Sequence, residues 1–146
     1  MDLDIDSNKK QCKLRVFLSS RNIIKVAKWI PAVIIVCISW YLSGKPRLTH
    51  LPTFRNADKV VHFFCFSMLS FWVAFACNIR TYKRVWIPSV IVSVYGIIDE
   101  IHQSFTPGRS CSFFDWGADT LGAVAGAFFF VYFLRFWLDN GRYENR

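Results

Sequence analysis

Ionisable and amide side chains gather where one long apolar run ends and the next begins. Asp99, Glu100 and Gln103 close the third apolar run, and Arg109 follows a Pro-Gly turn a few residues later. Carboxylates act as general acids, general bases or cation ligands, and a guanidinium can clamp a carboxylate or a phosphate through two parallel hydrogen bonds. Placing charged or strongly polar groups next to apolar segments costs free energy. Their concentration here therefore indicates a functional role.

A second polar pair opens the apolar run before this cluster. Asp58 and His62 are four residues apart, which places them about 40° apart on a helix, one above the other on the first turn. The pair can belong to a functional site, or it can be a helix N-cap acid with a histidine paired to it. The sequence leaves these two interpretations open.

The last apolar run begins with acids and continues with glycines. Asp115, Asp119, Gly122 and Gly126 share about 60° of arc on a helix, and Ala127 lies on another face. A Gly-x-x-x-Gly pair lets a neighbouring backbone approach closely. This helix is therefore predicted to pack through Gly122 and Gly126, beneath a rim of acids.

The amino-acid composition indicates that these polar groups belong to a membrane protein. Hydrophobic residues make up 53% of the 146 positions, with fifteen Phe and six Trp. So small a soluble domain could not bury this much apolar surface, and a membrane span needs about 20 apolar residues. Four segments qualify: 26–43, 60–79, 85–98 and 118–138. The third is short for a span unless its Asp99 end is protected.

The basic residues predict the orientation. Thirteen of the eighteen Lys and Arg residues flank the ends that would face the cytoplasm. The positive-inside rule then predicts an all-α membrane protein, a bundle of four transmembrane helices with both termini cytoplasmic. Its predicted parts are a basic N-terminal segment (1–25), the four-span domain (26–138) and a cytoplasmic tail (139–146). The acid and histidine cluster would face outward.

Several other functions are not indicated. The net charge of +8 is explained by a basic flank lying against anionic lipid, so the predicted partner is the lipid bilayer and no nucleic acid is expected. The five cysteines show no paired spacing, and no HExxH or CxxC motif occurs. The sequence therefore predicts no metal site and no cofactor; a set of His62, His102 and Glu100 is the weakest alternative, and His102 is expected in the solvated loop.

Three motifs, in this order, resemble those of the VanZ-like family of small bacterial multi-pass membrane proteins. They are Asp58-Lys59-x-x-His62, then Asp99-Glu100-x-His102-Gln103 before Pro107-Gly108-Arg109, then Asp115-x-x-x-Asp119-Thr120-Leu121-Gly122-x-x-x-Gly126. The match covers residues 58–126. Two positions depart from the family: Phe66 stands where a tyrosine is frequent, and Asp119 where many relatives carry asparagine.

The resemblance implies a protein of the bacterial cytoplasmic membrane that reduces susceptibility to glycopeptide antibiotics such as teicoplanin, with no settled reaction. We favour a binding protein, in which the outward cluster captures a glycopeptide or a lipid-linked cell-wall precursor. One alternative is a membrane-embedded enzyme acting on a lipid-linked or phosphate-bearing substrate, in which Glu100 or Asp115 is the general acid or base with His62. Arg109 would then clamp the anionic group of the substrate. The other is a structural lock, in which Glu100 and Arg109 form a buried ion pair, or a transporter-like bundle. The sequence predicts no oligomeric state.

Overall fold

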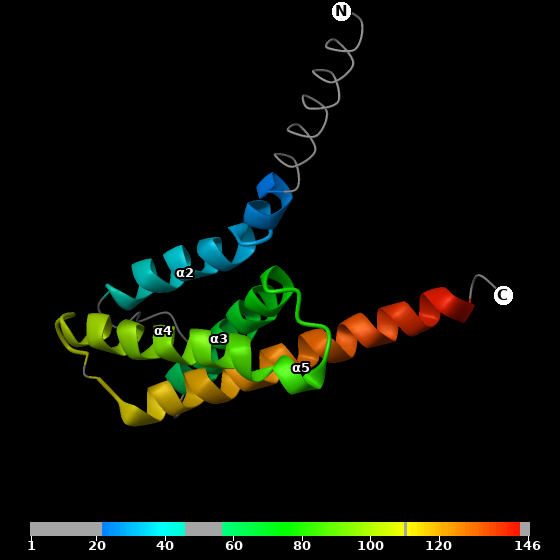
Figure 1. Ribbon diagram of the computed structural model, residues 1–146. Coiled ribbons are helices and arrows are strands. Elements are labelled where there is room, and N and C mark those ends of the chain that lie inside the picture. The colour runs from blue at the N-terminus through cyan, green and yellow to red at the C-terminus, as the bar shows by residue number, and fades with distance from the viewer. Residues whose placement is uncertain (1–21, 46–56, 110, 144–146) are drawn as a thin grey trace, which may run out of the picture.

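The computed structural model describes residues 22–45, 57–109 and 111–143, and their regular structure is helical. The principal helices are α2 (Ile30–Ser43), α3 (Ala57–Ala76), α4 (Trp86–Ser104) and α5 (Phe113–Tyr143), with a short 3₁₀ helix η1 (Tyr82–Arg84) before α4. α2, α4 and α5 lie alongside one another with α3 among them, and the C-terminal part of α5 extends beyond the other helices (Figure 1).

Four helical stretches of the described chain are long and apolar enough to cross a membrane. They are Asn22–Ser43, Ala57–Ala76, Tyr82–Ser104 and Phe113–Asn140. Large apolar side chains also cover their outer surfaces, and Phe64, Leu121 and Trp137 are each about two-thirds exposed. An apolar exterior of this kind is stable against lipid and not against water. The prediction of an all-α bundle of four membrane-spanning helices is confirmed.

The predicted third segment, 85–98, ended too early. α4 continues to Ser104, and Asp99, Glu100 and Gln103 are all buried on its last turns. Their spacing places the three side chains on one face of the helix, which is turned toward the other helices. The polar residues therefore do not terminate α4, because their side chains face the other helices and not lipid.

α3 and α5 form the central pair of the bundle. They share the most extensive helix–helix interface, α4 packs against both of them, and α2 packs against α3 and α4. The close approach of α3 and α5 occurs at Gly122 and Gly126. A Cβ atom at these positions would lie 3.0 Å from the carbonyl carbon of Phe63 and 2.6 Å from that of Ser67, respectively. Glycine is therefore required for this packing.

Two apolar clusters fill the interior. The first surrounds Phe66 and Val92 in the middle of the bundle. The second contains Ala74, Ala127 and Val131 and lies toward the end where α3 connects to α4. The turn that leaves α3 contains Asn78 in the left-handed region, with φ of 52°. Asparagine tolerates this conformation better than other non-glycine residues, so it suits the end of the helix.

Candidate functional site at the polar end of the bundle

The seven predicted site residues lie at one end of the bundle, which we call the polar end. Here α2 and α4 end and α5 begins (Figure 1). The first turns of α3 supply Asp58 and His62. α4 supplies Glu100 and Gln103, the following loop supplies Arg109, and α5 supplies Asp115 and Asp119. Residues up to 61 positions apart in sequence are thus brought to one region.

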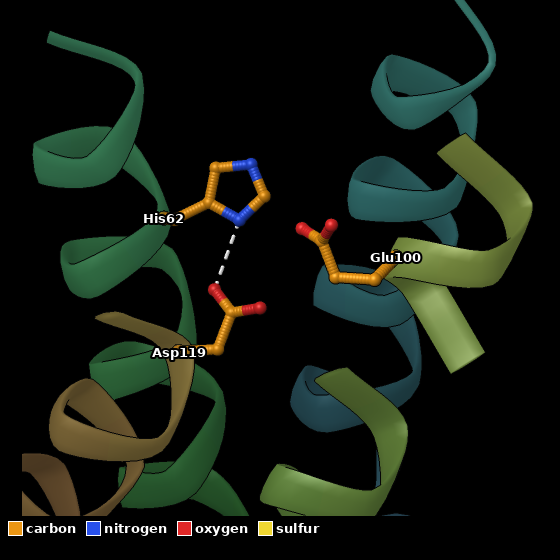
Figure 2. A group of neighbouring side chains, drawn as sticks. All are labelled: His62, Glu100 and Asp119. Atoms are coloured by element: carbon orange, nitrogen blue, oxygen red, sulfur yellow. Dashed lines mark hydrogen bonds and ion pairs between the residues drawn. The ribbon is translucent and has the colours of Figure 1, made fainter. Parts of the chain in front are cut away.

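The centre of the polar end is a buried His–Asp pair. The Nδ1 atom of His62 lies 2.9 Å from Oδ1 of Asp119, and the two residues are 8% and 0% exposed. The Glu100 carboxylate extends from α4 toward the same imidazole ring (Figure 2). One donor atom of each of the three residues lies within 4.8 Å of the other two. We call these residues, His62, Glu100 and Asp119, the central triad.

Two carboxylate oxygens of the central triad are buried without a hydrogen bond. Oε2 of Glu100 accepts the backbone N–H of Ser112 at 2.7 Å. The other oxygen, Oε1, and Oδ2 of Asp119 have no partner among the described residues. Buried polar atoms are normally paired, so this pair of oxygens requires a physical explanation.

Glycine at position 96 makes room for Asp119. A Cβ atom there would lie 3.2 Å from both Cβ and Oδ2 of Asp119, and 3.3 Å from Cε1 of Phe66. Phe66 itself is 1% exposed, and its ring is nearly parallel to that of His62, with centroids 6.1 Å apart. Because Gly96 has no side chain, the Asp119 carboxylate and the Phe66 ring can both pack against α4 at this position.

Asp99 and Ser43 complete the polar end, although neither was predicted as a site residue. Asp99 is 1% exposed, and the Ser43 hydroxyl lies 2.7 and 2.9 Å from its two oxygens. The Gln103 amide donates to Asp99 at 3.0 Å and lies 3.4 Å from Nε2 of His62. Asp99 could have been predicted from the sequence, because it directly precedes the site residue Glu100 in the same motif. Nothing local marks Ser43, since its role depends on where α2 packs.

The lock alternative assumed an ion pair between Glu100 and Arg109, and these two residues do not form one. The Arg109 guanidinium instead lies 3.3 Å from the carboxylate of Asp58, while Glu100 binds the start of α5. Asp58 is likewise not the partner of His62, which pairs with Asp119. Asp58 and His62 project from the same face of α3 toward neighbouring segments. Each therefore binds a residue on one of those segments and not the other residue of α3.

Two more ionisable groups lie near the edge of the polar end. Lys59 forms an ion pair with Asp115, joining α3 to α5, and the Lys59 side chain is 35% exposed. His102 was expected in a solvated loop, and this is also wrong. It belongs to the last turn of α4 and stacks on Trp40 of α2, with ring centroids 3.9 Å apart. The His102 ring therefore packs against α2 and is not part of the central triad.

A cavity of about 120 Å³ opens beside the central triad. Its lining comes from α2, α3, α4 and the loop after α4. The polar lining residues are Ser39, Ser43, Asp58, His62, Asp99, Gln103 and Arg109. Three of its lining residues, Leu42, Asp58 and Val61, are 41%, 36% and 43% exposed, so the cavity borders the outer surface of the bundle. Polar groups from four segments therefore converge on one small space.

The charge of the polar end is unbalanced. Five carboxylates, those of Asp58, Asp99, Glu100, Asp115 and Asp119, lie beside the fixed cations Lys59 and Arg109. Those two cations are both engaged by carboxylates. Even with His62 protonated, carboxylates outnumber cations here. Such a region attracts a cation or a hydrogen-bond donor more strongly than an anion.

Comparisons with known proteins agree with the motifs. A search of curated proteins and one of solved structures find no significant match. A model of the VanZ/LLP1 family matches residues 3–135, which is most of the chain and includes every residue of the polar end. With four helices able to span a membrane, this protein is a multi-pass membrane protein that belongs to the VanZ/LLP1 family.

Proposed function

We propose that the protein binds an ammonium or amide group of an envelope ligand at the polar end, and that this binding reduces susceptibility to glycopeptide antibiotics. The observation that carries the proposal is the cavity, whose wall combines Asp58 and Asp99 with the amide of Gln103. Carboxylates and an amide oxygen accept hydrogen bonds from ammonium or amide groups. The excess of carboxylates favours a positively charged ligand group.

The size of the cavity limits what can enter it. Sites for drug-sized molecules commonly have volumes of about 300–1,000 Å³, whereas this cavity has about 120 Å³. A whole glycopeptide would not fit, but one of its amino or amide groups would. The same holds for an amino-bearing group of a lipid-linked wall precursor, whose lipid would remain among the surrounding lipids. The ligand is therefore expected to insert one group and to rest the remainder on the membrane surface.

Orientation and location are parts of the same proposal. We propose that the protein resides in the bacterial cytoplasmic membrane with both termini in the cytoplasm, so that the polar end faces outward. Thirteen of eighteen basic residues at the opposite side support this orientation. An envelope ligand would then meet the cavity without crossing the bilayer.

The test measures protection and abundance in the same strains. Asp58→Asn and Arg109→Lys should restore sensitivity to a teicoplanin-like glycopeptide to the level of a strain that lacks the protein, while membrane abundance stays near normal. Asn cannot carry the charge, and Lys lacks the planar guanidinium whose N–H group donates to Asp58. Asp139→Asn and Arg135→Lys are matched controls, because both side chains are exposed and lie far along α5 from the polar end.

A structural lock makes a different prediction. If Asp58 and Arg109 only join α3 to the loop, each single change should lower abundance together with protection. The double change Asp58→Asn with Arg109→Gln should then restore both, since no charge remains unpaired. Rescue by the double change would overturn the binding proposal.

A further inference from the structure

The central triad has the composition of a metal site that the spacing of its residues in sequence does not suggest. It combines one imidazole with two carboxylates, from α3, α4 and α5, and their donor atoms lie within 4.8 Å of one another. Figure 2 shows the Glu100 carboxylate directed at the His62 ring, above the Asp119 carboxylate. Three convergent donors from three helices define a common point between them.

The unpaired oxygens provide the independent observation. Glu100 and Asp119 are 2% and 0% exposed, and each has one oxygen without a hydrogen-bond partner among the described residues. The Gln103 amide nitrogen is directed at Asp99 and His62, so it does not satisfy them. A buried carboxylate is stable only when a proton, a hydrogen bond or a cation compensates its charge. One divalent cation between the two would compensate both.

From this geometry we infer that the central triad binds a divalent transition-metal ion, with Zn²⁺ or Mn²⁺ as the best matches. One nitrogen and two carboxylate oxygens suit these ions, whereas Mg²⁺ and Ca²⁺ prefer oxygen donors alone. Three protein ligands leave at least one coordination position open, as in zinc sites that bind water or substrate. His62 lines the cavity, so this open position lies next to the proposed ligand space.

The donor spacing is compatible with one ion. Two donors on a tetrahedral zinc ion lie about 3.4 Å apart when each bond is about 2.1 Å long. The donor atoms of the central triad lie within 4.8 Å of one another, a limit about 1.4 Å wider. Rotation of the Glu100 and Asp119 side chains toward the His62 ring would close this difference. The three helices would then be joined at a single point below Asp58 and Arg109.

The test uses the full chain, purified in detergent and treated with EDTA. After equilibration with Zn²⁺ alone and removal of free metal, elemental analysis should find one zinc per chain. The midpoint of thermal unfolding should rise on addition of Zn²⁺ or Mn²⁺ and change far less with Mg²⁺. Absence of stoichiometric zinc in the wild-type protein would overturn the inference, whatever any variant does.

Variants then assign the ligands. Glu100→Gln and Asp119→Asn should each weaken zinc binding by at least about 100-fold, because even partners that only support a metal ligand commonly cost 10- to 100-fold. Asp58→Asn is the matched control, since Asp58 lies at the polar end outside the triad, and its zinc affinity should stay within about threefold of wild type. Unchanged binding in both triad variants would place the metal elsewhere and contradict the inference.

Cobalt distinguishes this site from a cysteine site. The described chain contains four free cysteines, at positions 37, 65, 77 and 111. Co²⁺ bound by the triad should show visible ligand-field bands without the charge-transfer absorption of a thiolate ligand. A thiolate band would overturn the assignment.

This inference is independent of the proposed envelope ligand. Asp58→Asn should lose protection and keep zinc, so failure of one proposal leaves the other standing.

Discussion

The two ends of the bundle are held together by different forces, although α3 and α5 contribute to both. At the polar end, buried ionisable residues such as His62, Asp99 and Asp119 are held through directed hydrogen bonds. Toward the other end, Ala74, Ala127 and Val131 pack closely and carry no side-chain polar atoms. The polar end is therefore stabilised by specific hydrogen bonds and ion pairs, and the opposite end by close packing of apolar side chains. Substitutions should therefore fail for different reasons at the two ends.

The largest effect is expected where a charge loses its partner. His62→Leu leaves Asp119 buried without its hydrogen-bonded partner, and breaking a buried pair in this way costs about 3 to 5 kcal/mol. The free energy of unfolding in detergent should fall by that amount. His102→Leu is the matched control, because His102 contacts Trp40 by stacking and is bonded to no carboxylate in the described structure. Equal losses in the two variants would show that the polar end does not depend on this pair.

A smaller loss is expected when the hydrogen bond between α2 and Asp99 is removed. Ser43→Ala removes the hydroxyl that lies 2.7 Å from Asp99, and hydrogen bonds to charged groups contribute about 1.5 to 3 kcal/mol. Ser89→Ala is the control near the opposite end, where the hydroxyl donates only to the Val85 carbonyl one turn earlier. Unfolding free energies of both variants check this. A greater loss at Ser89 would contradict the view that directed bonds to carboxylates stabilise the polar end.

The third prediction concerns shape. Gly126→Ala places a methyl group against the backbone carbonyl of Ser67, and such overpacking costs about 1 to 3 kcal/mol. Gly117 lies on the same helix with open space around its Cβ position. Gly117→Ala should therefore leave stability unchanged or raise it by up to about 1 kcal/mol, through reduced backbone entropy. Thermal unfolding of the two variants measures the difference, and similar midpoints would disprove that α3 and α5 require glycine at their contact.

Much of the fold follows from local properties of the sequence. Apolar runs of the right length predict the spans, because lipid requires a continuous apolar helix surface. The glycine stripe at positions 122 and 126 lies against α3, as its spacing suggests. Helical periodicity alone does not predict the burial of Ala127. It falls on another face of α5 and is still fully buried, in the second apolar cluster, because α5 is covered by more than one helix.

The sequence by itself determined which chemical groups this protein carries and that they meet at one end of a membrane bundle. Residue types, apolar lengths and 3.6-residue periodicity are local, so they can be read along one chain segment. Only the tertiary structure decided the partners. Asp119 binds His62, Arg109 binds Asp58, and Ser43 reaches Asp99 from a helix that no motif includes. The reason is that pairing depends on how each helix is rotated and shifted against its neighbours, and that arrangement results from packing across the whole bundle.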